Sequence, residues 1–161
     1  MKRSGFKQKE RKPLKRTVFR VKTPIGASKT PKTRKRKSEL KKLKERLWEL
    51  CREITRKRYG NHCYTCPSNG LEGSNWQTGH FISSSICSVF MRYELTNLRP
   101  QCYSCNINKS GNWLAFKDHL RADGIDTDVL EQMNRDTKGK QYDILWYESK
   151  VSEYEAIFAS P

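Results

Sequence analysis

The sequence predicts a small α+β domain that is stapled by a structural zinc, flanked by helices and preceded by a disordered basic tail. Three observations lead to this prediction: two C-x-x-C pairs with 35 residues between them, a turn-rich region between the pairs, and helical apolar spacing on either side. The chain has 161 residues, which is room for one domain with appendages. We therefore expect a single active centre.

Residues 1–37 are interpreted as the tail. They hold sixteen Lys or Arg residues against one acid, Glu10, so nearly all of the net charge of +16 lies there. A block of like charge repels itself and has little apolar surface to bury, so we expect disorder in the free protein. Nucleic acid is the favoured partner, because phosphates neutralised by basic side chains release counterions. Lys35, Arg36 and Lys37 are candidate contacts.

A membrane surface is the rival partner of the tail. Pro13, Pro24 and Pro31 interrupt its few apolar residues, which argues against an amphipathic helix of useful length. The chain also lacks a run of about 20 apolar residues that would span a bilayer, and its N-terminus lacks the apolar core of a signal peptide. We therefore expect an intracellular protein that does not bind membranes.

Three regions follow the tail. Residues 38–58 are predicted to form an amphipathic helix, because Ser38 can cap it and leucines recur along it at three- and four-residue intervals. Its basic face either lies along DNA or is simply solvated. Residues 59–122 are the expected zinc-bound core, and residues 123–161 the expected C-terminal helices. The predicted elements in these two regions are strands near 76–82 and 96–99 and helices over 106–120, 127–134 and 141–158.

The two C-x-x-C pairs are the strongest motif in the sequence: Cys63, Cys66, Cys102 and Cys105. Each pair places two thiolates on one side of a tight turn, and two facing turns make the tetrahedral sulphur cage of a structural zinc. Redox pairs or unconnected thiols are the alternatives, but the chain shows no thioredoxin-like βαβ pattern, so zinc is favoured. Four thiolates close the metal's shell, which makes this zinc structural.

Three other residues receive structural interpretations, and Cys87 is left without a role. Cys51 and Cys87 have no partner at metal-ligand spacing, and Cys51 is expected to be a small buried residue of the first helix. Trp113 and Phe116 follow a helical spacing, so we interpret them as core residues rather than as platforms for stacked bases.

His80 lies between the cysteine pairs, and Asn106 directly follows the last cysteine. A strand carrying His80 across the start of a helix at Asn106 would present an imidazole and an amide oxygen to one phosphate, near the positive end of the helix dipole. Metal-assisted hydrolysis needs a neutral imidazole that takes a proton from water and oxygen ligands for a hard divalent ion. A structural histidine is the commoner alternative, but the position between zinc pairs in a basic protein favours a site.

At these residues the sequence resembles the HNH or ββα-metal (His-Me finger) nucleases that carry a structural zinc. A fuller string is more particularly similar to the phage NinG (Rap) recombination family: Gly79-His80-Phe81, Arg92-Tyr93, Asn97, Gln101-Cys102, Cys105-Asn106 and Ser110-Gly111-Asn112. The similarity is close over residues 63–112 and loose over the C-terminal helices. It implies a zinc-stapled ββα core.

The resemblance also implies a metal-dependent, structure-selective DNA endonuclease that acts on branched recombination intermediates such as Holliday junctions and D-loops. By motif position, His80 would be the general base, Asn97 the central asparagine that fixes the strand of the base, and Asn106 the ligand of a catalytic magnesium or manganese ion. Arg92 and Lys109 fall within the matched string and would contact phosphate. A phage protein of this kind would act in the host cytoplasm.

One residue departs from the pattern of many zinc-stapled relatives, which place an acidic metal ligand immediately before the base. Here that position is Gly79, so water, substrate phosphate or a more distant acid such as Glu94 would have to complete the metal shell. The departure keeps an alternative open: a non-catalytic zinc module that binds branched or single-stranded DNA and recruits recombination factors. RNA binding would suit the tail but gives no role to His80.

The sequence leaves the oligomeric state open. Symmetric cutting of a junction favours a homodimer, joined through the helix of residues 39–57 or through the C-terminal helix. The apolar stripes of these helices would equally well pack against each other within one chain.

Overall fold

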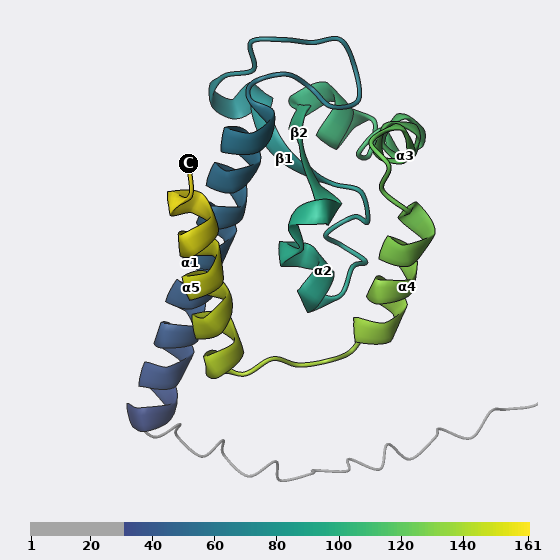
Figure 1. Ribbon diagram of the computed structural model, residues 1–161. Coiled ribbons are helices and arrows are strands. Elements are labelled where there is room, and N and C mark those ends of the chain that lie inside the picture. Colours follow the sequence, from purple (N-terminus) through teal and green to yellow (C-terminus); the bar gives the residue numbers. More distant parts are fainter. Residues whose placement is uncertain (1–30) are drawn as a thin grey trace, which may run out of the picture. The chain divides into compact units, whose positions relative to one another are not determined.

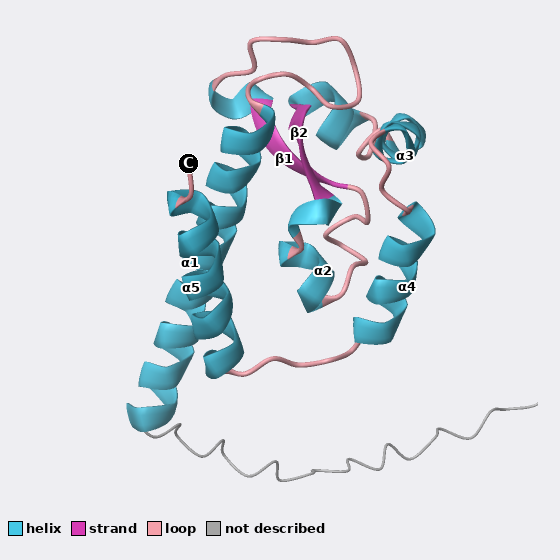
Figure 2. Ribbon diagram, in the orientation of Figure 1, coloured by secondary structure: helices cyan, strands magenta, loops and turns pink. Residues whose placement is uncertain are grey.

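The computed structural model describes residues 31–161, which form a small α+β unit with a two-stranded antiparallel sheet (Figures 1 and 2). The expected disorder of residues 1–30 lies outside the described residues. The elements in order are α1 (Pro31–Tyr59), η1 (Gly73–Asn75), β1 (Trp76–His80), α2 (Val89–Tyr93), η2 (Leu95–Asn97), β2 (Leu98–Cys102), η3 (Ser104–Asn108), α3 (Trp113–Ala122), α4 (Thr127–Thr137) and α5 (Ile144–Ala159). None of the helices within the described range is long and apolar enough to cross a membrane.

The helix α1 begins at Pro31, seven residues before the expected cap at Ser38. Proline suits the first position of a helix, because its fixed φ is helical and its missing N–H has no partner there anyway. Lys and Arg are good helix formers, so the basic part of α1 that precedes Ser38 can be helical without an apolar stripe. The expected boundary at residue 37 is therefore corrected: Lys35, Arg36 and Lys37 are exposed residues of α1 rather than part of a tail.

The helix α5 lies alongside α1 and runs in the same direction (Figure 1). The two helices share one apolar core with α2 and β2, and its fully buried members include Leu47, Leu50 and Tyr147. At the edge of this core, Arg46 lies 3.2 Å from the carboxylate of Glu155. The apolar stripes of the first and last helices are thus used within one chain.

The two strands pair in a register that places Trp76 opposite Cys102 and His80 opposite Leu98. Every residue of β2 is buried. The first strand ends at His80, two residues earlier than expected. Beyond it, the backbone N–H and C=O groups of Ile82 form hydrogen bonds with the side-chain amide of Asn97 rather than with the other strand. A two-stranded sheet is marginal alone, so it depends on the elements packed around it.

The expected continuous helix over residues 106–120 is broken, and this prediction was wrong. A π-helical segment, η3, ends at Asn108, and α3 begins only at Trp113. Between them Ser110, Gly111 and Asn112 all have positive φ, which no continuous helix contains. The side-chain amide of Asn112 donates to the carbonyl of Thr65 at 2.9 Å, so a tertiary bond to the first cysteine turn helps to hold the break.

The helices α3 and α4 close a second apolar core over the end of β1. Its buried members are Phe81, Ile82, Met91, Phe116, Leu120 and Leu130. Phe116 is fully buried as expected, but Trp113 is 44% exposed, so its assignment to the core was wrong. Asp126 caps α4 by accepting from the N–H groups of Asp128 and Val129.

Gly79 is required by a close approach of the two strands. A Cβ atom at this position would lie 1.9 Å from Oε1 of Gln101, far inside van der Waals contact. Gln101 is fully buried and its amide donates to Thr65 Oγ1 at 2.9 Å and to the Gly111 carbonyl at 2.7 Å, so it cannot simply move away. The glycine that departs from the acidic pattern is therefore explained by packing.

This contact predicts a non-additive pair of substitutions. Gly79→Ala should lower the free energy of unfolding by about 1–3 kcal/mol, the usual cost of overpacking. In a Gln101→Ala background the same change should cost much less, because the clashing side chain is gone. Urea unfolding of the zinc-loaded single and double variants measures both effects. Additive losses would show that the contact does not constrain position 79.

Candidate functional site

The four cysteines of the two C-x-x-C pairs meet in one cluster. Their sulphur atoms all lie within 4.8 Å of one another, and Cys66 and Cys102 are 3.8 Å apart. A tetrahedral site with zinc–sulphur bonds of about 2.3 Å has sulphur–sulphur edges of about 3.8 Å, so the cluster fits a zinc ion. The loop after α1 supplies Cys63 and Cys66, the end of β2 supplies Cys102, and η3 supplies Cys105.

Polar groups surround these sulphurs. The N–H of Cys105 donates to Cys102 Sγ at 3.4 Å, and Ser68 Oγ lies 3.2 Å from Cys66 Sγ. Burial opposes ionisation of Cys66, but hydrogen bonds with Ser68 prevail and lower its pKa to about 6. Burial raises the pKa of Cys105 to about 12, so a metal at this site must displace a proton. The cluster can therefore hold a structural zinc.

The remaining cysteines lie elsewhere. Cys51 is fully buried on α1, with its sulphur 3.5 Å from the carbonyl of Tyr93, and burial raises its pKa to about 12. This placement confirms the structural interpretation of Cys51. Cys87 is half-buried beside the second core, where burial raises its pKa as well. Neither thiol belongs to the four-sulphur cluster.

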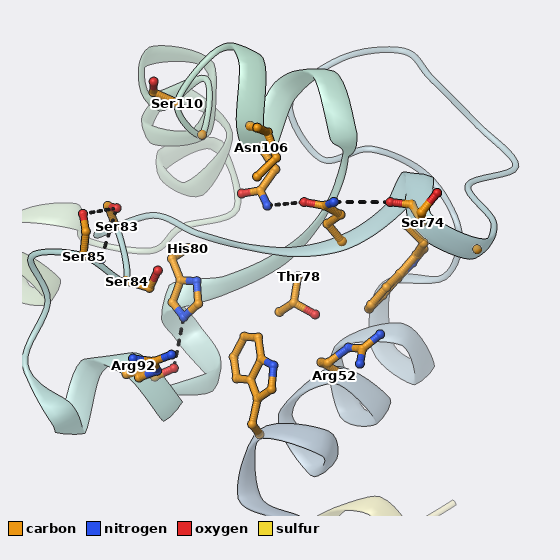
Figure 3. A pocket seen from close by; sticks show the side chains of 16 residues that line it. Arg52, Ser74, Thr78, His80, Ser83, Ser84, Ser85, Arg92, Asn106 and Ser110 are labelled. Atoms are coloured by element: carbon orange, nitrogen blue, oxygen red, sulfur yellow. Dashed lines mark hydrogen bonds between the residues drawn. The ribbon is translucent and has the colours of Figure 1, made fainter. Parts of the chain in front are cut away.

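An open pocket of about 770 Å³ lies between α1, β1, the serine-rich loop after β1, and η3 (Figure 3). Within the described residues it brings together side chains from five separate segments of the chain. Its lining includes Trp48, Arg52, Ser74, Trp76, Gln77, Thr78, His80, Ser83, Ser84, Ser85, Arg92, Asn106 and Ser110. The two expected functional residues His80 and Asn106 therefore share one pocket.

His80 is held as a neutral ring with one nitrogen available. Its Nε2 lies 3.1 Å from the carbonyl oxygen of Arg92, and because a carbonyl can only accept, Nε2 carries the proton. The lone pair is therefore on Nδ1, and that nitrogen faces the pocket (Figure 3). Burial lowers the pKa of His80 to about 4, so the ring is uncharged at neutral pH. This state is the one that a general base requires.

Trp48 holds the ring of His80 from α1. The two rings are stacked with centroids 5.3 Å apart and planes 8° apart. The sequence analysis missed this residue, because Trp48 lies next to the buried Leu47 and outside the apolar spacing that defines the helix. An aromatic residue adjoining the stripe of a basic helix was the only sequence signal available.

Asn106 faces the same pocket (Figure 3). Its amide nitrogen donates to Gln77 Oε1 at 2.6 Å, which leaves its amide oxygen open to a ligand. The expected help from a helix dipole is absent, because Asn106 lies within the five-residue segment η3 rather than at the start of a long helix. No Asp or Glu of the described chain lines the pocket. Glu94 lies outside it and accepts from Thr96 N and Oγ1, so it does not complete a shell there.

Asn97 lies outside the pocket and is fully buried. Its Oδ1 accepts from the N–H of Ile82 at 2.8 Å, and its Nδ2 donates to the carbonyl of Met91 at 2.9 Å. One amide thus joins the segment just after His80 to the segment just before Arg92, whose carbonyl holds the ring. This amide therefore links the two backbone segments that flank the imidazole of His80.

The candidate cations are divided between two regions. Arg92 is exposed and lines the pocket together with Arg52 of α1 (Figure 3). Lys109 is exposed at the end of η3 and does not line the pocket. Lys37 lies eleven residues before Trp48, about 16 Å along the helix at 1.5 Å per residue, and Lys35 and Arg36 are farther still.

One further polar residue of the pocket lining is Thr78. The hydroxyl of Thr78 is buried and has no hydrogen-bond partner within the described residues. It lies between His80 and Arg52 (Figure 3). Buried polar atoms are nearly always paired, so this hydroxyl is an exception, which it shares with Arg99 Nε and Gln101 Oε1 among the described residues.

The zinc site predicts one tightly held zinc ion per chain. Cys63→Ser and Cys105→Ser should each lose the metal and unfold the core, because a structural zinc contributes about 10 kcal/mol or more in small modules. Cys87→Ser is the matched control, since this half-buried cysteine lies outside the cluster and should retain zinc. Elemental analysis and circular dichroism measure the two outcomes. A well-folded protein without zinc would contradict the prediction.

The sequence was also compared with known proteins. No curated protein and no solved structure matches it. A protein-family model described as Bacteriophage Lambda NinG protein matches residues 2–158. This match includes both cysteine pairs, His80 and Asn106 and extends into the last turn of α5. The chain therefore belongs to the bacteriophage lambda NinG protein family.

Proposed function

We propose that this protein is a metal-dependent, structure-selective DNA endonuclease that acts on branched intermediates of phage DNA recombination. The observation that carries the proposal is the neutral His80, whose free Nδ1 faces a pocket shared with the amide oxygen of Asn106. A base beside an oxygen ligand is the arrangement that metal-assisted phosphodiester hydrolysis needs. The net charge of +16 supports a polyanionic substrate.

The order of elements supports a nuclease of the HNH or ββα-metal type. Two antiparallel strands are followed by the helical segment η3, and the cysteine cluster joins the end of the second strand to that segment. His80 ends the first strand and Asn106 lies on the helical segment, as the proposed roles of base and metal ligand require. The segment is short, so the proposal depends on side-chain geometry more than on the helix.

In the proposed reaction the scissile phosphate lies between the guanidinium groups of Arg52 and Arg92. His80 Nδ1 takes a proton from a water molecule whose oxygen attacks the phosphorus. The bond from phosphorus to the 3′ oxygen breaks, a solvent water molecule protonates that oxygen, and 5′-phosphate and 3′-hydroxyl ends result. The carbonyl of Arg92 stabilises the positive charge that the ring acquires, because it accepts from Nε2.

Asn106 would be the ligand that this chain offers to a magnesium or manganese ion. When bound, such an ion stabilises the charge that develops on the phosphoryl oxygens. A single neutral amide oxygen is a weak ligand set, since magnesium sites normally include one or two carboxylates together with phosphate and water. We therefore propose that DNA phosphate and water complete the shell, and that Gln101 excludes an acidic ligand at Gly79 by occupying its space.

Two symmetric cuts in a four-way junction need two such pockets, so we propose that two copies act on one junction. The apolar stripes of α1 and α5 pack against each other in one chain, so a homodimer would have to use another surface. The site of action that we propose is the host cytoplasm.

The catalytic assignment predicts three defects that differ in kind. His80→Ala should lower cleavage of a synthetic four-way junction about a hundredfold or more, with zinc content and junction affinity retained. Asn106→Ala should instead raise the manganese concentration needed for half-maximal cleavage, because an oxygen ligand is lost. Asn97→Ala should lower cleavage at every metal concentration, because it misplaces the base. Equal cleavage by His80→Ala and the unaltered protein would refute the assignment.

The low pKa of His80 predicts an unusual pH profile. The neutral ring is the active base and is lost only as the pH falls through its pKa, which is about 4 rather than the ordinary 6.5. The pH dependence of kcat/KM reports the pKa values of the free enzyme. The kcat/KM for junction cleavage should therefore not fall as the pH is lowered from 7 to 5, so it has no acid limb in this range. Trp48→Leu should expose the ring of His80 and shift the fall in kcat/KM to a higher pH. A limb near 6.5 in the unaltered, zinc-loaded protein would contradict this prediction.

The absence of an acidic side chain from the lining of the described pocket favours one alternative, a non-catalytic zinc module that binds branched DNA and recruits recombination factors. The same junction assay separates the two functions. Tight binding of junctions without cleavage in magnesium or manganese would replace the nuclease with this module.

A further inference from the structure

A second cavity, of about 410 Å³, adjoins the pocket that holds His80. Four residues line both spaces: His80, Ser83, Ser110 and Gly111. Most of the remaining wall is apolar and consists of Phe81, Ile82, Ile86 and Trp113. A mainly apolar space therefore shares a wall with a polar, cationic one.

Trp113 is the main exposed aromatic surface of this cavity. The residue is 44% exposed, yet its ring is held in place by a nearly parallel stack on Phe81, with centroids 6.0 Å and planes 13° apart. The amine of Lys117 lies 4.9 Å from the ring centroid. Exposed aromatic rings beside cations are the surfaces on which proteins stack the bases of unpaired nucleic acid.

The chain explains why the two spaces adjoin. His80 is the last residue of β1, and Phe81 follows it directly. His80 lines both spaces, whereas Phe81 lines only the second cavity, where its ring supports Trp113. A nucleotide likewise has its phosphate and its base on either side of one sugar.

We propose that the second cavity binds an unpaired nucleobase of the nucleotide whose phosphate lies beside His80. This inference rests on the proposed function for its DNA substrate. Phosphate contacts carry no information about branching, whereas a base site accepts a base at a branch far more readily than one that is stacked and paired in a duplex. The cavity would thus supply the selectivity for branched DNA. Its polar lining residues include Arg135 and Glu131, which lie 3.9 Å apart and largely balance each other's charge.

A double-mutant cycle, which combines substitutions in the protein with changes in the DNA, tests this site. Trp113→Ala is compared with Leu114→Ala, which removes the next, 71% exposed side chain of α3 and leaves the cavity intact. Each protein is titrated, at fixed salt and without added divalent ions, with three versions of one duplex: unbroken, with a single-base bulge, and with an abasic residue as the bulge. Zinc content and circular dichroism check that the variants fold.

Trp113→Ala should weaken binding of the bulged duplex about tenfold to a hundredfold, the range for one lost stacking contact, and should leave the unbroken duplex unaffected. The abasic bulge should weaken binding by the unaltered protein similarly, and Trp113→Ala should then cost nothing further. Trp113→Phe and Leu114→Ala should keep most of the affinity for the bulge.

Equal losses by Trp113→Ala on bulged and abasic DNA would overturn the proposal, because the ring would then not contact the base. Equal affinity of the unaltered protein for the bulged and abasic duplexes would also overturn it, and this comparison needs no variant that folds. Cleavage of the same bulged duplex in magnesium or manganese is measured in parallel. A failure of the nuclease proposal is thereby distinguished from a failure of the base site, because the binding cycle does not require cutting.

Discussion

The convergence of four cysteine sulphurs is the constraint on which the rest of the site depends. It joins the loop after α1 to the end of β2 and to η3, three segments with little regular structure between them. A sheet of two five-residue strands cannot hold such segments by itself. Because Asn106 directly follows Cys105, the cluster also places the amide that faces His80. A structural metal held by the cysteines would thus help to position Asn106, because Asn106 is bonded directly to one of the cysteines along the chain.

The second support of the site comes from the packing of α1 against α5. Their shared core fixes α1 beside β2, and from that position the helix contributes both Trp48 and Arg52 to the pocket. Trp48 shields His80 from water and so contributes to the burial that keeps the ring neutral. The helix α1 therefore lines the candidate site and α5 supports α1 through their shared core, although neither helix belongs to the sheet or to the cysteine cluster.

The pocket combines an imidazole, two guanidinium groups and an amide oxygen with no carboxylate from the described chain. This composition follows from the packing of Gln101, which occupies the space where a side chain of residue 79 would project. Gln101 in turn joins Thr65 to Gly111 and so ties the first cysteine turn to the break before α3. The side chain that excludes an acidic residue from position 79 therefore also stabilises the region around the cysteine cluster. A bound phosphate would add the negative charge that the protein omits, and would raise the pKa of His80 towards the working pH.

The sequence by itself determined which four cysteines would cluster, the approximate positions of both strands and the terminal helices, and the shared location of His80 and Asn106, because these follow from local spacing and motif order. The tertiary structure alone decided the rest. The helix expected after Cys105 breaks because Asn112 bonds to Thr65, and Trp48 reaches His80 because α1 packs beside the sheet. Trp113 is exposed although its spacing is helical. Periodicity records which side chains share a face, but contacts between distant segments determine where a helix stops and what that face meets.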